Sequence, residues 1–340
     1  MKKKRFTLIE ILMCIILLSL LFSILLPSLR EARRKAKFTR WQMCIRNWAN
    51  DPDCVLNYNF QDGPGSDILR NGADGCDSER YQPKFYNGYL MNDQGVDVPH
   101  NFEWVPSGGR WGKYKKALQF NGSDTYILVP TVPAVDFTPN NGFTIITWLK
   151  FDKIDLGDCP FAKSLWGTAR DASAQYDLYS NTYAGKYGQG SFDVDAFTIC
   201  ATWSNTEVDF DKAGWVQLVL RYKPLVKDDP LHTPNGFQLM CFVNGEPLSG
   251  WQDTTDDNPY TASATDWEST QQHQVPLFIG CAGGYRKYWA RASWDPNDDS
   301  LDNLIKRIFF VQGIMDEFLV FKRALSDGEI VADYEMGKDL

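Results

Sequence analysis

The chain begins with an apolar run of a length that few soluble folds accommodate. Residues 6–29 read FTLIEILMCIILLSLLFSILLPSL and contain one charged side chain, Glu10, and four basic residues precede the run. About 20 apolar residues in helical form span the hydrocarbon core of a bilayer. The run therefore predicts a membrane-embedded helix, and the rest of the chain is what that helix carries.

The charges divide the chain into two unlike parts. Residues 1–40 hold ten Lys and Arg and two Glu, a net charge of +8. The other 25 basic and 41 acidic residues, of 35 and 43 in the whole chain, give the remainder a net charge of −16. We expect a basic stem and an acidic soluble head. An acidic head argues against nucleic acid as a partner, because phosphates require a basic surface.

Eight cysteines are present, and no CxxC motif occurs among them, which argues against zinc ribbons and thioredoxin-like redox sites. Cys44, Cys54 and Cys76 follow the apolar run closely in the sequence. Two interpretations stay open for these three residues: some pairing as disulfides, if the head is exported, or buried free thiols.

Three roles compete for the apolar run. A cleaved secretory signal would have a shorter apolar core and a small-residue exit site, whereas helical periodicity continues here into PSLREARRKAKFTRW. A plain membrane anchor explains the length but not Glu10, because a carboxylate inside a bilayer is costly and usually marks a functional contact. The third role is a membrane helix in which Glu10 makes a specific functional contact. Basic residues flank both ends of the run, so charge alone does not decide its orientation.

The sequence KKKRFTLIEILMCIILLSLLFSILLPSL resembles the N-termini of type IV prepilins and type II secretion pseudopilins. The resemblance implies cleavage by a prepilin peptidase between Arg5 and Phe6 and N-methylation of Phe6, although the family usually has Gly where Arg5 stands. Glu10 becomes the fifth mature residue, where the family keeps a glutamate that pairs with the terminal amine of a neighbouring subunit, a cation that neutralises it. Pro27 stands where pilins often carry a helix-kinking proline.

The same resemblance implies a bacterial inner-membrane protein. Its N-terminus lies in the cytoplasm before processing, and its head lies in the periplasm or at the cell surface. The implied partners are the membrane, the prepilin peptidase and other pilin-like subunits.

Beyond the stem the sequence is typical of a β-rich fold. The helix is expected to fade over residues 41–53, with Asn47, Asn50 and Asp51-Pro52 as stop signals. Short segments bounded by turn residues then predict strands at residues 55–63, 116–120, 125–130, 142–151, 196–203, 215–222, 236–244, 276–280, 307–312 and 313–323. Asn-Gly pairs at 121–122 and 244–245 predict tight turns. Ser326 and Glu329 predict a capping box for a short C-terminal helix.

These segments resemble the LamG and concanavalin A-like family of jelly-roll sandwiches. The matching stretches are LQFNGSDTYILVP, GFTIITWLKF, GWVQLVLRY, CFVNGEPL, PLFIG and, most specifically, GIMDEFLVFKRALSDGEI. The expected fold class is mainly β, an antiparallel jelly-roll sandwich with one long N-terminal transmembrane or stem helix and a short C-terminal helix. The expected domains are a basic leader at 1–5, a pilin-like helix and stem at 6–50, and the sandwich at 54–340.

The sandwich resemblance also implies one structural calcium ion, bound by the acidic residue of the closing motif, Asp316. Asp62, Asn121 and Asp124 offer further hard oxygens of the kind that calcium prefers. The alternative is that these side chains cap turns. The acidic stretch at residues 295–302 lacks the glycine and spaced glutamate of an EF-hand loop, so a solvated loop is expected there.

Aromatic residues gather in two of the expected loops, where flat rings near Asp and Asn are able to recognise sugars by stacking and hydrogen bonding. The candidate ligand-binding residues are Trp251, Trp267, Tyr288, Trp289 and Trp294, with Tyr260 and Tyr285 beside them. The alternative, which we favour for any single residue, is that the loops use these rings as small cores of their own.

The sequence argues against catalysis. Residues 207–211 read EVDFD, which places Glu207, Asp209 and Asp211 on one face of a strand. Glycosidases of the sandwich fold use two carboxylates on such a strand, but the third acid here is Asp211 and not the required glutamate. The three histidines lie in separate loops and suggest no catalytic triad. We expect a non-enzymatic protein.

The predicted function is a pilin-like membrane subunit, part of a pseudopilus or secretion-type assembly, that displays a carbohydrate- or protein-binding sandwich. Two alternatives from other classes stay open. One is an anchored glycan-binding protein that does not polymerise, and the other is an anchored glycoside hydrolase.

Overall fold

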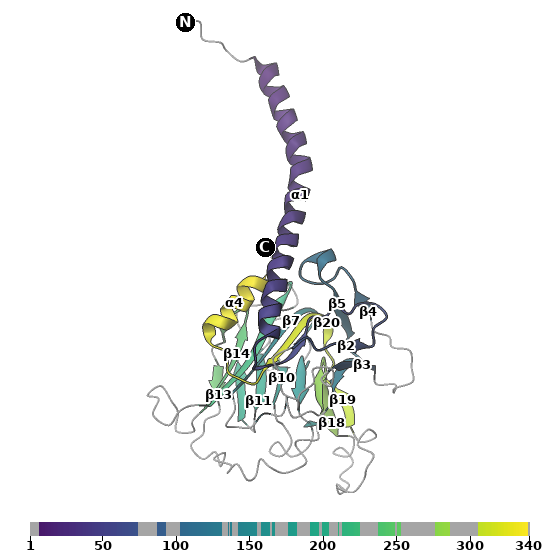
Figure 1. Cartoon of the computed structure of the whole chain (residues 1–340), viewed down its shortest axis with the longest axis vertical. Helices are drawn as coiled ribbons and strands as arrows, with labels where there is room; N and C mark the ends of the chain where they lie inside the picture. Colours follow the sequence, from purple (N-terminus) through teal and green to yellow (C-terminus); the bar gives the residue numbers. More distant parts are fainter. Residues whose placement is uncertain are drawn as a thin grey trace.

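A computed structural model describes most of the stem and the framework of the head. The described residues are 7–73, 87–92, 103–130, 135, 137, 142–154, 158–163, 165–166, 176–181, 191–196, 199–203, 210, 213–224, 237–248, 250–252, 276–285 and 305–338. Within them, one long helix projects from a head built mainly of β-strands (Figure 1).

Helix α1 runs over Leu8–Ala49 and forms the whole stem. Thr7 is its N-cap and forms a capping box with Glu10, and the N–H of Asn50 closes the C-terminal end on the Arg46 carbonyl. Residues 8–30 are exposed on all sides, whereas Trp41, Cys44, Ile45 and Ala49 are buried against the head. The expectation that the helix fades from residue 41 is therefore wrong, because residues 41–49 stay helical and pack on the sandwich. The stop signals at Asn50 and Asp51-Pro52 are confirmed, since Asn50 is the C-cap of α1.

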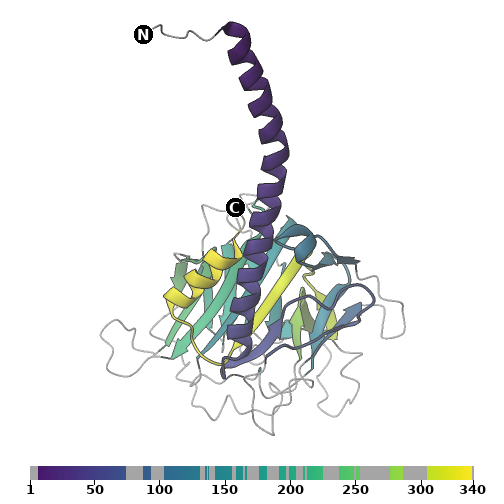
Figure 2. The same ribbon diagram turned by 45° about the horizontal axis from the view of Figure 1, so that its top comes forward.

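The first sheet has eight strands and lies beneath the C-terminal part of α1 (Figure 2). Its order is β15 (Glu246–Pro247), β14 (Phe237–Val243), β13 (Val216–Pro224), β7 (Phe143–Lys153), β20 (Gln312–Phe321), β5 (Ala117–Asn121) and β4 (Glu103–Val105), and β1 (Cys54–Tyr58) also pairs with β20.

The second sheet has nine strands. Its order is β16 (Gly250–Gln252), β12 (Ile199–Trp203), β11 (Ser191–Ala196), β10 (Tyr176–Asn181), β8 (Phe161–Lys163), β17 (Leu277–Ile279), β6 (Thr125–Val129), β3 (Gly88–Asn92) and β2 (Ile68–Leu69). A three-stranded sheet joins β19 (Ile305–Ile308), β18 (Ala282–Tyr285) and β9 (Leu165–Trp166). The β9–β18 pair is parallel, and the other described strand pairs are antiparallel.

The central strands of the first sheet are apolar on both faces. Ile145 of β7 pairs with Leu220 and Val320, and all three belong to the core between the two sheets. Ile146, the next residue, lies beside Val219 and Leu319 on the opposite face, because successive side chains of a strand alternate. Helices α1 and α4 (Asp327–Gly337) cover that second face.

The expected fold class is confirmed: two largely antiparallel sheets, one long apolar N-terminal helix and a short C-terminal helix. The Asn244-Gly245 turn is confirmed as well, with positive φ at both residues between β14 and β15. The capping box of Ser326 and Glu329 is present. One expected strand, residues 196–203, is instead the end of β11 and all of β12, which pair as a hairpin.

We predict that α4 is held by burial and not by its own helix propensity. Both Ile330 and Val331 belong to α4. The Ile330 side chain is fully buried against the sheet, whereas Val331 is 39% exposed. Ile330→Ala should lower the free energy of unfolding by about 2–4 kcal/mol, because it leaves a cavity, and Val331→Ala should change it by less than about 0.5 kcal/mol. Denaturant unfolding of the full chain in detergent, followed by tryptophan fluorescence, measures both. Equal effects would contradict this account of α4.

Candidate functional site: the exposed helix and its junction with the head

The N-terminal part of α1 presents an apolar surface with no covering layer. Large apolar side chains from Leu8 to Leu29 are about half exposed or more, with Leu8 at 86% and Ile24 at 71%. Soluble proteins rarely expose a contiguous apolar surface of this size. Within the described residues, α1 is the helix long and apolar enough to cross a bilayer.

Glu10 lies one turn from the start of this surface. Its carboxylate accepts hydrogen bonds from the Thr7 N–H, at 2.8 Å, and from the Thr7 hydroxyl, at 2.9 Å, and the Glu10 N–H donates to Thr7 Oγ1. This capping box satisfies N–H groups that the first turn of a helix leaves unpaired. The pattern T-x-x-E was visible in the sequence, so the box could have been predicted there.

Pro27 lies inside α1 and does not end it. The missing N–H of a proline leaves a carbonyl one turn earlier without its helical partner. Ser23 and Ser28, on either side, donate their hydroxyls to the carbonyls of Leu20 and Leu25, at 2.8 Å each. The helix remains continuous and curves along its length (Figure 2).

Aromatic rings join the stem to the head. Trp41 and Phe38 of α1 pack on Trp111 and Tyr114, which lie at the short 3-10 helix η2 (Gly112–Tyr114) between β4 and β5. The ring centroids of Trp41 and Trp111 are 5.3 Å apart, and those of Phe38 and Tyr114 are 5.9 Å apart. Trp41 and Trp111 are almost completely buried, so this contact excludes water from the base of the stem.

A buried ionic cluster lies directly beneath these rings. Arg110 is enclosed, with its Nε 3.0 Å from Asp316 Oδ1 and its Nη2 2.5 Å from Glu317 Oε2. The indole N–H of Trp41 also donates to Glu317 Oε2, at 2.5 Å. Burial raises the pKa of Glu317, and Arg110 opposes that rise. Burial works against the charge on Arg110, but the surrounding carboxylates outweigh it and raise the Arg110 pKa.

Lys115 adds a second buried cation to the junction. Its Nζ lies 3.7 Å from the centroid of the Trp41 ring and donates to the Asn59 carbonyl at 2.6 Å. Burial lowers the pKa of Lys115 to about 7, although Asp316 and Glu317 favour the charged form. When Lys115 is protonated, its ammonium group faces the negatively polarised face of the Trp41 indole, which is an attractive cation–π arrangement.

Asp333 of α4 connects the stem to the sheet through three donors. Its carboxylate accepts from Trp48 of α1 at 3.3 Å, from Trp148 of β7 at 3.3 Å and from Gln217 of β13 at 2.8 Å. Burial raises the pKa of Asp333, while Arg110 and these hydrogen bonds oppose the rise. One side chain thus ties together both helices and two strands.

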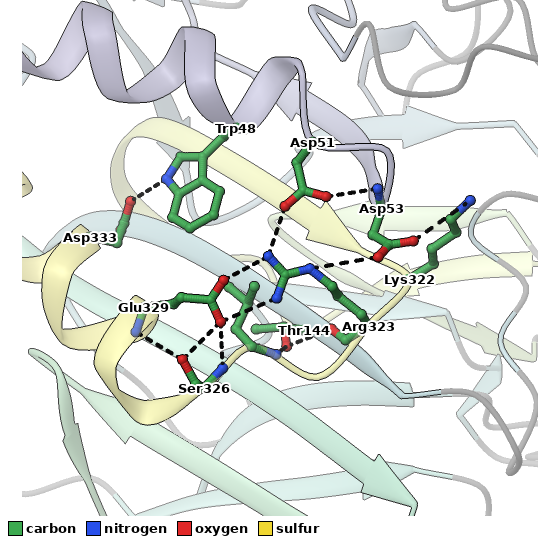
Figure 3. A network of polar contacts seen from close by, with 10 residues as sticks. Trp48, Asp51, Asp53, Thr144, Lys322, Arg323, Ser326, Glu329 and Asp333 are labelled. Atoms are coloured by element: carbon green, nitrogen blue, oxygen red, sulfur yellow. Dashed lines mark hydrogen bonds and ion pairs between the residues drawn. The ribbon is translucent and has the colours of Figure 1, made fainter.

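Arg323, just after β20, connects the end of the stem to the start of α4 (Figure 3). Its guanidinium lies 2.7 Å from Asp51 Oδ2 and 2.7 Å from Glu329 Oε1, and its Nε lies 3.7 Å from Asp53 Oδ2. Thr144 of β7 receives the Leu325 N–H and donates to the Arg323 carbonyl. The closing motif recognised in the sequence therefore joins stem, sheet and helix.

The predicted calcium ligands have protein partners in this structure. Asp316 is fully buried, and its carboxylate is taken up by the side chain and the N–H of Arg110. Asp62 accepts the Arg70 N–H, and Asn121 caps its own turn by accepting N–H groups from Ser123 and Asp124. The turn-capping alternative describes Asn121. Among the described residues, no three His, Cys, Asp or Glu side chains gather as metal ligands.

The head has a polar pocket of about 420 Å³ at the N-terminal end of α4. It is lined by Arg221, Lys223, Gln238, Met240, Ala324, Leu325, Ser326, Asp327 and Glu329. Arg221 is nearly buried there, and its guanidinium donates to the Leu325 carbonyl and pairs with Asp327. These bonds fasten α4 to β13. They give the nearly buried Arg221 a structural role that requires no bound ligand.

Several predicted residues lie outside the described part of the chain. These are the processing residues Arg5 and Phe6, the carboxylates Glu207, Asp209 and Asp211, and the aromatic residues Tyr260, Trp267, Tyr288, Trp289 and Trp294. The backbone of Trp251 belongs to β16 and that of Tyr285 to β18. The roles predicted for these residues stay predictions.

For one of the three cysteines near the stem, Cys44, the structure favours a buried free thiol over a disulfide. Cys44 is a buried free thiol on the face of α1 that meets the head, and burial raises its pKa to about 12. Cys54 is buried at the start of β1, and Cys76 lies outside the described residues. The buried-thiol interpretation therefore describes Cys44.

Comparisons with known proteins find similarity in structure alone. No family model and no curated protein matches the sequence. Domain 4 of an extracellular GH43 arabinanase from Geobacillus stearothermophilus, solved with arabinotriose, has a TM-score of 0.45 at 12% identity, over 84% of this chain and 98% of that one. A Trypanosoma rangeli sialidase in complex with the inhibitor DANA has a TM-score of 0.43 at 13% identity, over 84% and 33%.

The binding domain of botulinum neurotoxin DC, solved with rat synaptotagmin II, has a TM-score of 0.38 at 10% identity, over 84% of this chain and 52% of that one. This chain thus spans about half of the toxin domain and a third of the sialidase. At these scores and identities the likenesses assign no function.

The Arg323 network predicts a pH dependence of stability. Hydrogen bonds from Arg323 lower the pKa of Glu329 to about 2 from an ordinary 4.5. A carboxyl group with a lowered folded-state pKa stabilises the fold above its unfolded pKa, and this contribution is lost as the pH falls from about 4.5 to about 2.

Glu329→Gln keeps a side chain suited to the capping box and removes the charge. We expect the free energy of unfolding to fall by about 1 kcal/mol at pH 7, because the pair is partly exposed to water, and the difference from wild type to vanish near pH 2. The control is Glu335→Gln on the same helix, whose pair with Lys338 is exposed. A Glu329→Gln deficit that is independent of pH would contradict the prediction.

Proposed function

We propose that the chain is a pilin-like subunit of the bacterial inner membrane, of the type IV pilin or type II pseudopilin kind, with a sandwich head in the periplasm or at the cell surface. The observation that carries the proposal is the division of α1 into two parts. Its first 22 residues, 8–29, expose apolar side chains, and residues 41–49 are built into the head. A simple anchor needs the first part but not the second.

The dimensions of α1 support this role. At a rise of 1.5 Å per residue, residues 8–29 extend over about 33 Å, close to the roughly 30 Å of a bilayer hydrocarbon core. The same surface is able to pack against equivalent helices once subunits leave the membrane. Because Trp41, Asp333 and Arg323 fix the helix on the head, the arrangement of the helices would set the orientation of every head.

Processing by a prepilin peptidase follows from the proposal. Cleavage after Arg5 would leave Phe6 and the N-cap residue Thr7 ahead of the first helical residue, Leu8. We expect mass spectrometry of the protein isolated from its membrane to show a mature chain that begins with N-methylated Phe6. A terminus at Met1 would remove processing from the proposal, and Phe6 without a methyl group would remove the methylation step alone.

Assembly would use the Glu10 carboxylate as the partner of a neighbouring subunit's terminal amine, in competition with its capping bonds to Thr7. Glu10→Ala should abolish filaments or oligomers while membrane insertion persists, because it removes the buried countercharge. Thr7→Ala is the matched control: it removes the cap hydroxyl, worth about 1 kcal/mol of helix stability, and keeps the carboxylate.

Electron microscopy and cross-linking of membrane fractions measure the assembly of both variants. If Glu10→Ala and Thr7→Ala weaken assembly equally, capping explains Glu10. An unaffected Glu10→Ala variant would defeat the charge-pairing role.

The head would bind a polysaccharide or protein partner, without catalysis. The alternative is an anchored binding protein that does not polymerise, and the capping box favours it in one respect, since it gives Glu10 a partner within its own chain. The Thr7 and Glu10 variants distinguish the two functions.

A further inference from the structure

A cluster of basic side chains lies on α1 directly after its apolar part. Residues 30–40 contain Arg30, Arg33, Arg34, Lys35, Lys37 and Arg40, which we call the basic collar, and a single acid, Glu31. Consecutive residues of a helix turn by about 100°, so five of these side chains lie within an arc of about 120°, and Lys35 lies on the opposite side of the helix. The collar separates the apolar surface from the acidic head.

Four of the six charges of the collar have no ion-pair partner within the described part of the chain. Arg30, Arg33, Lys35 and Arg40 are exposed and have no ion-pair partner there. Four cations this close together repel one another, and long flexible side chains lose entropy if they are held in place. The fold of the head does not need these charges.

Glu31, the one acid among residues 30–40, is paired with residues of the head and not with the collar. Glu31 accepts a hydrogen bond from the Tyr114 hydroxyl at 2.8 Å and pairs with Lys113, both of η2. Hydrogen bonds from Lys113 and Tyr114 lower the pKa of Glu31, which therefore stays ionised in this contact. Lys37 donates to the Lys338 carbonyl after α4. Arg30, Arg33, Lys35 and Arg40 thus keep a positive charge that no acid of the described residues pairs with.

When residues 8–29 occupy the hydrocarbon core, the collar lies in the lipid headgroup region of the membrane. The headgroup region of each leaflet is about 5–8 Å thick, which corresponds to some four to five helical residues. Arg30, Arg33 and Arg34 then lie at the depth of the lipid phosphates, and Lys35 lies at their outer edge. Guanidinium groups bind phosphate oxygens through two parallel hydrogen bonds.

We propose that the basic collar binds the headgroups of anionic phospholipids on the outer side of the membrane. This inference rests on the membrane span of the proposed function. Surrounding lipids reach both the arc of five cations and Lys35 on the opposite side of the helix, whereas a protein partner would contact one side. Bound headgroups would also offset the repulsion between an anionic membrane and a head with a net charge of −16.

The experiment uses the full chain, reconstituted in phosphatidylcholine vesicles with trace amounts of spin-labelled phosphatidylglycerol or phosphatidylcholine. Electron paramagnetic resonance measures the motionally restricted fraction of each lipid, and carbonate extraction measures insertion. We expect at least about threefold selection of phosphatidylglycerol at low salt, since basic side chains near the surface attract anionic lipids. In about 1 M salt, where the screening length is about 3 Å, the selection should largely disappear.

The test variant combines Arg30→Gln, Arg33→Gln and Lys35→Gln, and it should lose the selection while it remains inserted. The control combines Arg46→Gln, Lys150→Gln and Lys223→Gln, which removes the same charge from exposed positions further from the span, and it should keep the selection. Selection that persists in the test variant, or that falls equally in both, would overturn the proposal.

Two other results would overturn it in different ways. A wild-type protein without lipid selection, whose sedimentation shows self-association that the test variant lacks, would assign the collar to the acidic head of a second copy. Extraction of the wild-type protein by carbonate, with neither lipid restricted, would show that residues 8–29 do not span the bilayer. That result removes the proposed function itself, whereas the lipid results leave it intact.

Discussion

The arrangement of stem and head depends on the contact between Trp41 and the buried ions beneath it. The Trp41 indole donates to Glu317, which also receives Arg110, and Lys115 lies against the face of the same ring. Removing one member of such a cluster leaves another charge buried and unpaired, which is far more costly than replacing the whole cluster by apolar residues. The observed placement of the stem lets Trp41 contact both Glu317 and Lys115, so moving the stem would break contacts to two buried charges.

The stem is also part of the packing of the head. Strands β7, β13 and β20 carry apolar side chains on the face that points away from the sandwich, and Trp41 and Ile45 of α1 cover that face together with α4. A head cut from the chain near residue 50 would expose this surface, which makes aggregation a risk. A rigid joint follows from the same packing, because the helix cannot turn without exposing it.

The most specific part of the sandwich resemblance has a structural role in this chain. Asp316 and Glu317 neutralise Arg110, Arg323 joins Asp51 to Glu329, and Ser326 caps α4. An acidic residue in a recognised motif suggested a metal ligand, but burial beside an arginine makes it half of an ion pair. The residues of this motif therefore hold the stem, the sheet and α4 together.

The sequence by itself determined the local features: an apolar run long enough for a bilayer, strands bounded by turn residues, and the caps of α4, because periodicity and capping depend on neighbours a few residues apart. It marked the end of the stem helix at Asn50 but did not reveal that residues 41–49 remain fully helical. That segment contacts residues about 70 to 285 positions away in the chain. The partners of Asp316 and Lys115 were equally hidden. Tertiary structure decided them, because burial and pairing of charges depend on which distant strands lie side by side.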